Sequence, residues 1–210
     1  FYLEHIQETY LYIATLGYSI IYLNNQRIGH DELNLVWTQF QKCVYYDCYD
    51  VTSYLKEGQN QIKIELGNGM FNPSPLRLFG KYNLRERLGE IGEPRILCDL
   101  VSHNQVILSS DASWMQGEGH FLFNNLYLGE RVDLRLEMSV LKPVETKENI
   151  YHLEANFIPR IRRFQNVQSL SMIETDEGVL IDFNEMISGF INISFKANAG
   201  QKVRLQYSER

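Results

Sequence analysis

A positive net charge and long apolar runs are both missing from this sequence, and each absence excludes a class of protein. The chain has 20 Lys and Arg against 26 Asp and Glu, which gives a formal net charge of −6. Nucleic-acid binding needs clustered Lys and Arg, so we expect no nucleic-acid partner. No apolar run approaches the ~20 residues of a transmembrane helix, so we expect no membrane partner either.

Cysteine is scarce, and its spacing fits neither a disulfide framework nor a metal site. Cys43, Cys48 and Cys98 are an odd number and include no CxxC pair. Positions 43 and 48 would point to opposite faces of one regular strand. We interpret all three as small core or surface residues, which leaves the redox compartment undetermined. No signal peptide is visible from Phe1 onward, and periplasmic, secreted and cytoplasmic locations all stay open.

Aromatic residues are abundant, and their arrangement predicts strands. The chain has 13 Tyr and 11 Phe, residues that pack well on pleated surfaces. Several segments alternate apolar and polar residues or flank an Asn or Gly turn, as paired strands do. We expect strands at residues 10–15, 18–23, 61–66, 95–102, 105–109, 179–183, 189–196 and 202–208. The predicted class is all-β, with two antiparallel β-sandwich domains.

A polar segment divides the chain into two parts. Residues 139–149 contain Pro143 and show no periodicity, so we interpret them as a linker or a crossing strand. Residues 1–138 then form the first sandwich, and residues 150–210 begin a second, truncated one. Residues 50–55 predict one helical turn with Asp50 as its cap. Residues 67–93 are long and irregular, as functional loops often are.

Four short motifs lie near the end of the chain. They are Asp182-Phe183, Ser188-Gly189-Phe190, Ala199-Gly200 and Tyr207-Ser208-Glu209. These motifs resemble the opening of the concanavalin-like β-sandwich that precedes the catalytic barrel in bacterial α-L-rhamnosidases. The family usually has Gly-Gln-Asn after the Asp-Phe pair, where this chain has Asn184-Glu185-Met186.

The first half continues the resemblance. The strand–turn–strand at residues 16–29, the Asp50-Val51-Thr52 segment and the closing segment around Gly129-Glu130 are similar to the family's N-terminal jelly roll. The loop at residues 67–71, Gly-Asn-Gly-Met-Phe, resembles the family's Gly-Asn-Gly-Trp-Tyr loop. The Asp-Val-Thr segment also occurs in galactose-binding-like jelly rolls of β-galactosidases and β-glucuronidases.

The resemblance implies a non-catalytic N-terminal fragment of a glycoside hydrolase that releases terminal L-rhamnose from glycans or glycosides. Inversion by two carboxylates is then expected of a later (α/α)6 barrel, which the chain lacks. The fragment would be inactive alone, with that barrel and a rhamnose-containing glycan as partners. The alternatives are a stand-alone lectin-like module, the sugar-binding domain of a β-galactosidase or β-glucuronidase-type hydrolase, and a purely structural sandwich.

The candidate carbohydrate-binding residues are Gly67, Asn68, Gly69, Phe71 and Trp114. The first four belong to the loop at a strand end, where backbone can approach a ligand closely. Asn68 is the best single ligand candidate, and a tight turn needing positive φ is the alternative for this loop. Trp114 could stack on a sugar, or it could be packed with its indole N–H satisfied internally.

Catalytic residues and a metal site are not predicted. Some rhamnosidase modules bind rhamnose with calcium through an Asp-Asn pair, and Gly67 stands at the position of that Asp. We therefore predict no cofactor, with calcium as the alternative. Asp47 and Asp50 could bind a cation through their carboxylates, although a helix cap is the other role for Asp50.

Glu130, Asp133 and Arg135 have the residue types of a pair of acids with an arginine that could hold a substrate. Glu130 and Asp133 are three positions apart and would lie on opposite faces of a strand. We therefore predict a structural ion pair that involves Arg135.

Overall fold

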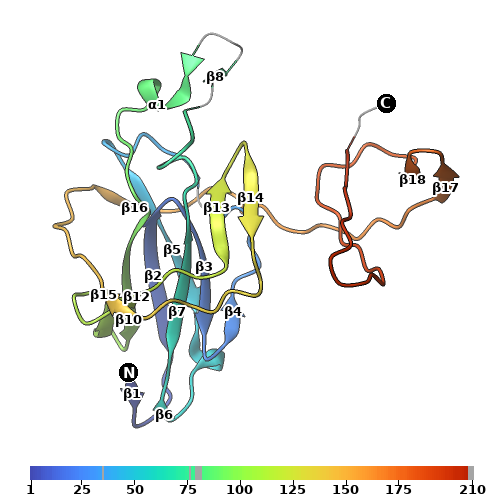
Figure 1. The fold of residues 1–210 in the computed structure, drawn as a ribbon. Coiled ribbons are helices and arrows are strands. Elements are labelled where there is room, and N and C mark those ends of the chain that lie inside the picture. Colours follow the sequence, from blue (N-terminus) through green and yellow to red (C-terminus); the bar gives the residue numbers. More distant parts are fainter. Residues whose placement is uncertain (35, 76, 79–81, 208–210) are drawn as a thin grey trace. The chain divides into compact units, whose positions relative to one another are not determined.

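The computed structural model describes residues 1–34, 36–75, 77–78 and 82–207. Two compact units are present, Phe1–Arg163 and Phe164–Arg210, and each is described by itself. Strands dominate, so the predicted all-β class is confirmed (Figure 1). Within the described residues, the helices are too short and polar to cross a membrane.

Two main sheets build the first unit. The larger sheet has the order β11 (Gln105–Ser109), β10 (Arg95–Ser102), β2 (Thr9–Leu16), β5 (Val44–Asp50) and β16 (Leu153–Ala155). The smaller sheet has the order β4 (Gln26–Ile28), β3 (Tyr18–Leu23) and β7 (Ile62–Gly67). Neighbouring strands run antiparallel, except that β16 runs parallel to β5.

Asparagine turns set the register of two hairpins. Asn24 and Asn25, between β3 and β4, have φ of 51° and 65°. His103 and Asn104, between β10 and β11, have φ of 47° and 60°. Two consecutive left-handed residues give a turn whose twist matches that of the flanking strands. The predicted strands at residues 18–23, 95–102 and 105–109 are confirmed with those bounds.

The hydrophobic core lies between the two sheets. Leu11 and Ile13 of β2 face it together with Ile21 and Leu23 of β3. A second cluster covers part of the opposite face of β2, because alternate residues of a strand point to opposite faces. Its buried members are Ala14, Leu16, Phe40, Val44 and Phe71.

Short elements occupy the connections. These are β1 (Tyr2–Leu3), β6 (Gly58–Gln59), β8 (Arg77–Leu78), β9 (Tyr82–Asn83), α1 (Leu84–Arg87), β12 (Met115–Gln116), β13 (Phe121–Asn125), β14 (Gly129–Val132) and β15 (Lys142–Pro143). The predicted helical turn is the 3₁₀ helix η1 (Thr52–Tyr54), whose N-cap is Val51. The Asp50 carboxylate accepts a hydrogen bond from the Thr52 backbone N–H at 3.0 Å.

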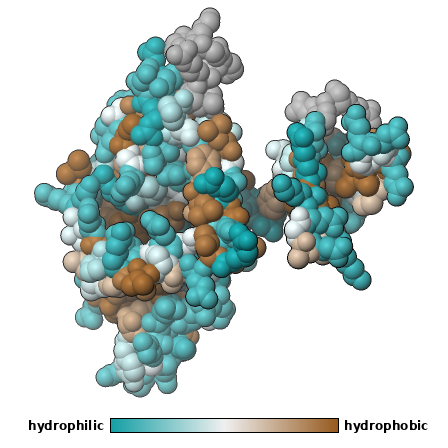
Figure 2. All heavy atoms as spheres, in the orientation of Figure 1, coloured by the Kyte–Doolittle hydropathy of each residue, from teal (hydrophilic) through white to brown (hydrophobic). Residues whose placement is uncertain are grey.

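The hairpin of β13 and β14 carries apolar side chains outside the sandwich core. Phe121, Leu122, Phe123 and Val132 are all exposed. Figure 2 shows the corresponding brown surface over this hairpin, beside mostly teal neighbours.

The second unit contains one hairpin among the described residues, β17 (Ser171–Thr175) with β18 (Gly178–Asp182). The latter agrees with the strand predicted at residues 179–183. The strands predicted at residues 189–196 and 202–208 are not found over the described residues, and Ser208 lies outside them. A strand needs a partner for its backbone N–H and C=O groups, and alternating residues such as Phe195 and Leu205 stay exposed here.

Residues 139–163 belong to the first unit. Within the predicted linker, β15 pairs with β12, and further along β16 adds to the five-stranded sheet. The compact units divide between Arg163 and Phe164. The predicted folding domains, 1–138 and 150–210, stay a prediction that proteolysis can test.

Candidate functional site

The predicted sugar-binding loop is fixed by an amide network. The Asn68 backbone N–H donates to Asn124 Oδ1 at 3.0 Å, and Asn68 Nδ2 donates to the Asn124 carbonyl at 2.7 Å. Asn68 Oδ1 accepts from Asn72 Nδ2 at 2.9 Å. The Nδ2 end of the Asn68 amide therefore holds the loop against β13, and the Oδ1 end holds Asn72.

The glycines of this loop have a geometric role. Gly69 has φ of 49°, and a Cβ there would lie 3.1 Å from the Gly17 carbonyl carbon. A Cβ at Gly67 would lie 3.3 Å from Asn124 Oδ1. The turn geometry that was the alternative for this loop is therefore present, and sugar binding by Gly67, Asn68 and Gly69 stays a prediction.

The two aromatic candidates lie in different hydrophobic clusters. Phe71 has 0% exposure and packs edge-on against Phe40 at 5.5 Å between ring centroids. With no exposed ring face, Phe71 is a core residue in this conformation and does not present a stacking surface. Trp114 packs against the core between the sheets, and its Nε1 donates to the Ser109 carbonyl at 3.0 Å. The structure does not bring Phe71 and Trp114 together.

Asp133 and Arg135, which follow β14, form an ion pair. Arg135 donates from Nε and Nη2 to the two carboxylate oxygens of Asp133, at 2.8 and 2.6 Å. These hydrogen bonds lower the pKa of Asp133 to about 2. Glu130 instead accepts from Asn124 Nδ2 at 2.8 Å. The predicted structural pair is confirmed, and the two acids do not face one another as a catalytic pair would.

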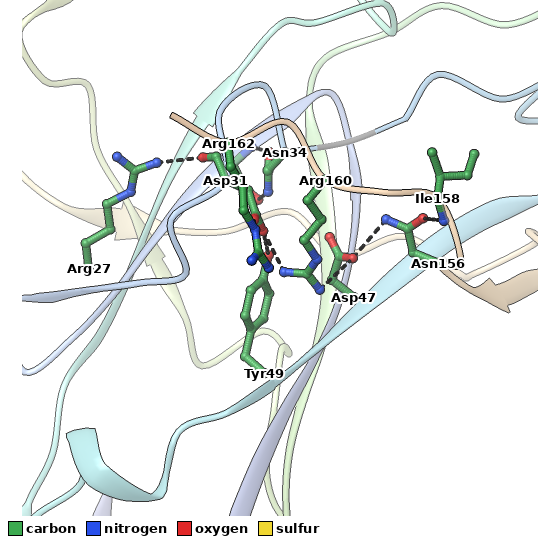
Figure 3. Close-up of polar contacts among 10 residues, drawn as sticks. Arg27, Asp31, Asn34, Asp47, Tyr49, Asn156, Ile158, Arg160 and Arg162 are labelled. Atoms are coloured by element: carbon green, nitrogen blue, oxygen red, sulfur yellow. Dashed lines mark hydrogen bonds and ion pairs between the residues drawn. The ribbon is translucent and has the colours of Figure 1, made fainter. Parts of the chain in front are cut away.

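A buried charge cluster, which the sequence did not predict, forms around Arg160 (Figure 3). Its Nη1 donates to Asp31 Oδ2 at 2.5 Å and its Nη2 to Asp47 Oδ1 at 3.1 Å. The Arg160 guanidinium also lies 4.5 Å from the centroid of the Tyr49 ring, whose hydroxyl donates to Asp31 Oδ2 at 3.1 Å. We call Asp31, Asp47, Tyr49 and Arg160 the charge cluster.

Strand periodicity explains how the charge cluster is assembled. Asp47 and Tyr49 are two positions apart on β5 and so point to the same face. Asp31 follows β4, and Arg160 follows β16. Asn156, also after β16, donates from Nδ2 to Asp47 Oδ1 at 2.9 Å. Three separate segments therefore meet at one buried point.

Burial sets the electrostatics of the charge cluster. Burial raises the pKa of Asp47, although the Asn156 hydrogen bond and the Arg160 charge oppose it. Burial, with the Asp47 charge, also raises the pKa of Tyr49. Burial alone would lower the pKa of Arg160, but Tyr49, Asp47 and Asp31 outweigh it and raise the pKa. Each buried charge thus has an opposite partner, as desolvation requires.

Cation binding by the predicted carboxylates has little support from the geometry. Asp47 is held by Arg160 and Asn156, and Asp50 accepts from Thr52. Among the described residues, no three His, Cys, Asp or Glu side chains are grouped as a metal site would need.

Three members of the charge cluster, Asp31, Tyr49 and Arg160, line an open cleft with a volume of about 570 Å³. The lining residues are Arg27, Gly29, His30, Asp31, Glu32, Tyr49, Arg160, Arg162 and Arg163. Guanidinium, imidazole and carboxylate groups can hydrogen-bond to an oxygen-rich ligand. Sequence reasoning missed this cleft because Arg160 is 129 positions from Asp31. The available signal was the run of residues 160–163, which supplies three of the four lining arginines.

Comparison with known proteins finds relatives that are α-L-rhamnosidases. An α-L-rhamnosidase of Formosa agariphila is 25% identical over 98% of this chain, and one of Streptomyces avermitilis is 24% identical over 98%. The chain spans only 23% and 21% of the lengths of these curated relatives.

Solved structures show the same fold. The α-L-rhamnosidase of Aspergillus terreus matches with a TM-score of 0.72 and 24% identity, over 88% of this chain and 23% of that one. The Streptomyces avermitilis α-L-rhamnosidase, solved in complex with L-rhamnose, matches with a TM-score of 0.70 and 23% identity, over 88% of this chain and 19% of that one. The family described as the α-L-rhamnosidase N-terminal domain matches residues 4–172, and the chain belongs to that family.

Proposed function

We propose that this chain is the non-catalytic N-terminal part of an α-L-rhamnosidase-like glycoside hydrolase that releases terminal L-rhamnose. It would support the catalytic barrel or present the glycan to it. The observation that carries the proposal is the family match over residues 4–172. The two curated relatives are several times longer than this chain, which leaves them room for catalytic domains elsewhere.

The state of the buried carboxylates supports a non-catalytic role. Inverting glycoside hydrolysis uses two carboxyl groups with the sugar between them, one that protonates the leaving-group oxygen and one that activates a water. Asp31 and Asp47, the buried acids of the described part, both accept from the same guanidinium of Arg160. A pair bridged in this way has no space between its members for a sugar.

An activity assay tests this proposal. The purified chain should not hydrolyse an aryl α-L-rhamnoside under conditions where the full-length Streptomyces avermitilis relative does. Turnover that co-purifies with the chain through two different columns would contradict the proposal. The Asp31→Asn variant then shows whether that turnover depends on the charge cluster.

Substrate presentation would use the Gly67–Gly69 loop, and we propose weak L-rhamnose binding there without calcium. A monosaccharide offers few contact atoms, so we expect a Kd on the order of millimolar. Asn68 lies on the loop and is half-buried. Rhamnose would have to share an amide that already holds the loop to Asn124 and Asn72.

NMR titration with L-rhamnose separates presentation from a purely structural role. Binding predicts shifts of the Gly67 and Gly69 backbone N–H signals that are lost in Asn68→Ala and kept in the exposed control Asn192→Ala. The loss of the Asn68 amide contacts with Asn124 and Asn72 should cost about 1–3 kcal/mol of stability. The titration therefore needs a temperature at which the variant is folded. No shifts at high millimolar rhamnose would favour the structural alternative.

A further inference from the structure

We propose that the arginine-lined cleft binds an anionic group carried by a glycan, either a carboxylate or a sulfate ester. This inference rests on the proposed function, which supplies the glycan. The whole chain has a net charge of −6, yet four arginines line this cleft against the two acids Asp31 and Glu32. The lining of the cleft therefore has more positive than negative side chains, although the whole chain is negative.

Arg162 supplies the most accessible cation of the cleft. Its side chain is 70% exposed, and Nε lies 3.8 Å from Asp31 Oδ1. At that distance the contact is an ion pair rather than a hydrogen bond. The guanidinium therefore keeps donors that can form a forked contact with two oxygens of a carboxylate or sulfate.

Two more arginines lie close enough to add to this contact. Arg27 donates from Nη2 to the Asp31 carbonyl at 2.7 Å, and Arg163 donates from Nε to Glu32 Oε1 at 2.7 Å. Figure 3 shows Arg27 and Arg160 on opposite sides of Asp31. These bonds hold both side chains at the cleft before any ligand arrives, which reduces the entropy lost on binding.

The charge cluster removes the main obstacle to anion binding. Asp31 lies in the cleft and would repel an anion, but it accepts hydrogen bonds from Arg160 and Tyr49 and faces Arg162. Its charge is therefore compensated from within the protein. The volume of about 570 Å³ lies in the range of known small-molecule sites and can hold a sugar.

Glu32 is the group that competes with a ligand for these cations. Its carboxylate lies against Arg163 on the lining of the cleft. Glu32→Gln removes that competing charge, so a bound anion should gain affinity. A network with only a structural role has no reason to respond in this direction.

The experiment is an NMR titration of the intact chain with D-glucuronate, a glucose sulfate monoester, D-glucose and L-rhamnose. We expect His30 and the Arg162 Nε–H to shift with an acidic sugar, with weaker binding at higher salt, and not with the neutral sugars. Comparing glucuronate with the sulfate ester identifies which anion is preferred. Arg162→Gln should weaken binding about tenfold, and Glu32→Gln should strengthen it. The control Arg131→Gln, on exposed β14, should leave it unchanged.

Three outcomes overturn the inference. One is the lack of cleft shifts with either acidic sugar, and another is equal binding of glucose and glucuronate. The third is an affinity that Arg162→Gln leaves unchanged. L-rhamnose shifts at Asn68 report separately on the proposed function, so either idea can fail while the other holds.

Discussion

Replacing Arg160 by methionine removes the single charge that joins Asp31 to Asp47, while most of the buried volume of the side chain remains. The variant loses two charge-assisted hydrogen bonds, at 2.5 and 3.1 Å, and the contact with the Tyr49 ring at 4.5 Å. The carboxylates of Asp31 and Asp47 are 4% and 1% exposed, so water cannot replace the lost partner at either of them.

The expected loss of stability depends on which hydrogen-bond partners each carboxylate retains in the variant. Removing one partner of a buried ion pair usually costs about 3–5 kcal/mol. Asp47 retains Asn156 at 2.9 Å, and Asp31 retains the Tyr49 hydroxyl at 3.1 Å. We therefore expect the lower end of that range, about 3 kcal/mol in the free energy of unfolding.

Urea unfolding followed by circular dichroism and tryptophan fluorescence measures this loss. Arg135→Met is the matched control, because its ion pair with Asp133 is on the surface and should matter far less. A loss for Arg160→Met no larger than that of the control would refute the reasoning, because it would mean that the buried acids do not need their partner.

The pH dependence of the free energy of unfolding is an independent test, because its direction can be predicted. Because burial raises the pKa of Asp47 above 3.8, its stabilising contribution is complete below that value and is lost as pH rises through the folded-state pKa. Without Arg160, whose charge lowers the pKa of Asp47, that pKa rises further. The stability difference between wild type and Arg160→Met should therefore shrink as pH falls from about 7 towards about 4.

Three further predictions concern the core, the thiols and the domain boundary. Phe71→Ala should lower the free energy of unfolding by about 3–5 kcal/mol, since the ring is fully buried, whereas exposed Phe121→Ala should cost less than about 1 kcal/mol; similar losses in urea unfolding would show that Phe71 is not core. A thiol reagent near neutral pH should label exposed Cys48 and spare Cys98, whose pKa burial raises to about 12; labelling of Cys98 without unfolding would contradict its burial. Limited proteolysis should cut first at residues 142–147, which are mostly exposed, and early cutting elsewhere with this segment protected would place the domain boundary differently.

Local periodicity and turn chemistry were enough to predict much of the first unit. The strands at residues 18–23, 95–102 and 105–109 have the predicted bounds, because alternation defines the two faces and Asn at positive φ defines the turn. The ion pair of Asp133 and Arg135 was predictable for the same reason, since both partners are close in sequence.

Contacts between residues far apart in the sequence determined the features that were not predicted. Strand β5, which lies between β2 and β16, was not predicted, because the buried Asp47 interrupts the apolar positions on one of its faces. The predicted loop residue Phe71 became a core residue only through packing against Phe40.

By itself, the sequence determined the all-β class, the hairpins and the family resemblance, because these depend on neighbouring residues. Only the tertiary structure decided which charges are buried together. Burying Asp31 and Asp47 is tolerable only because Arg160 arrives from a distant segment, and alternation specifies the face of a side chain without specifying its partner across the fold.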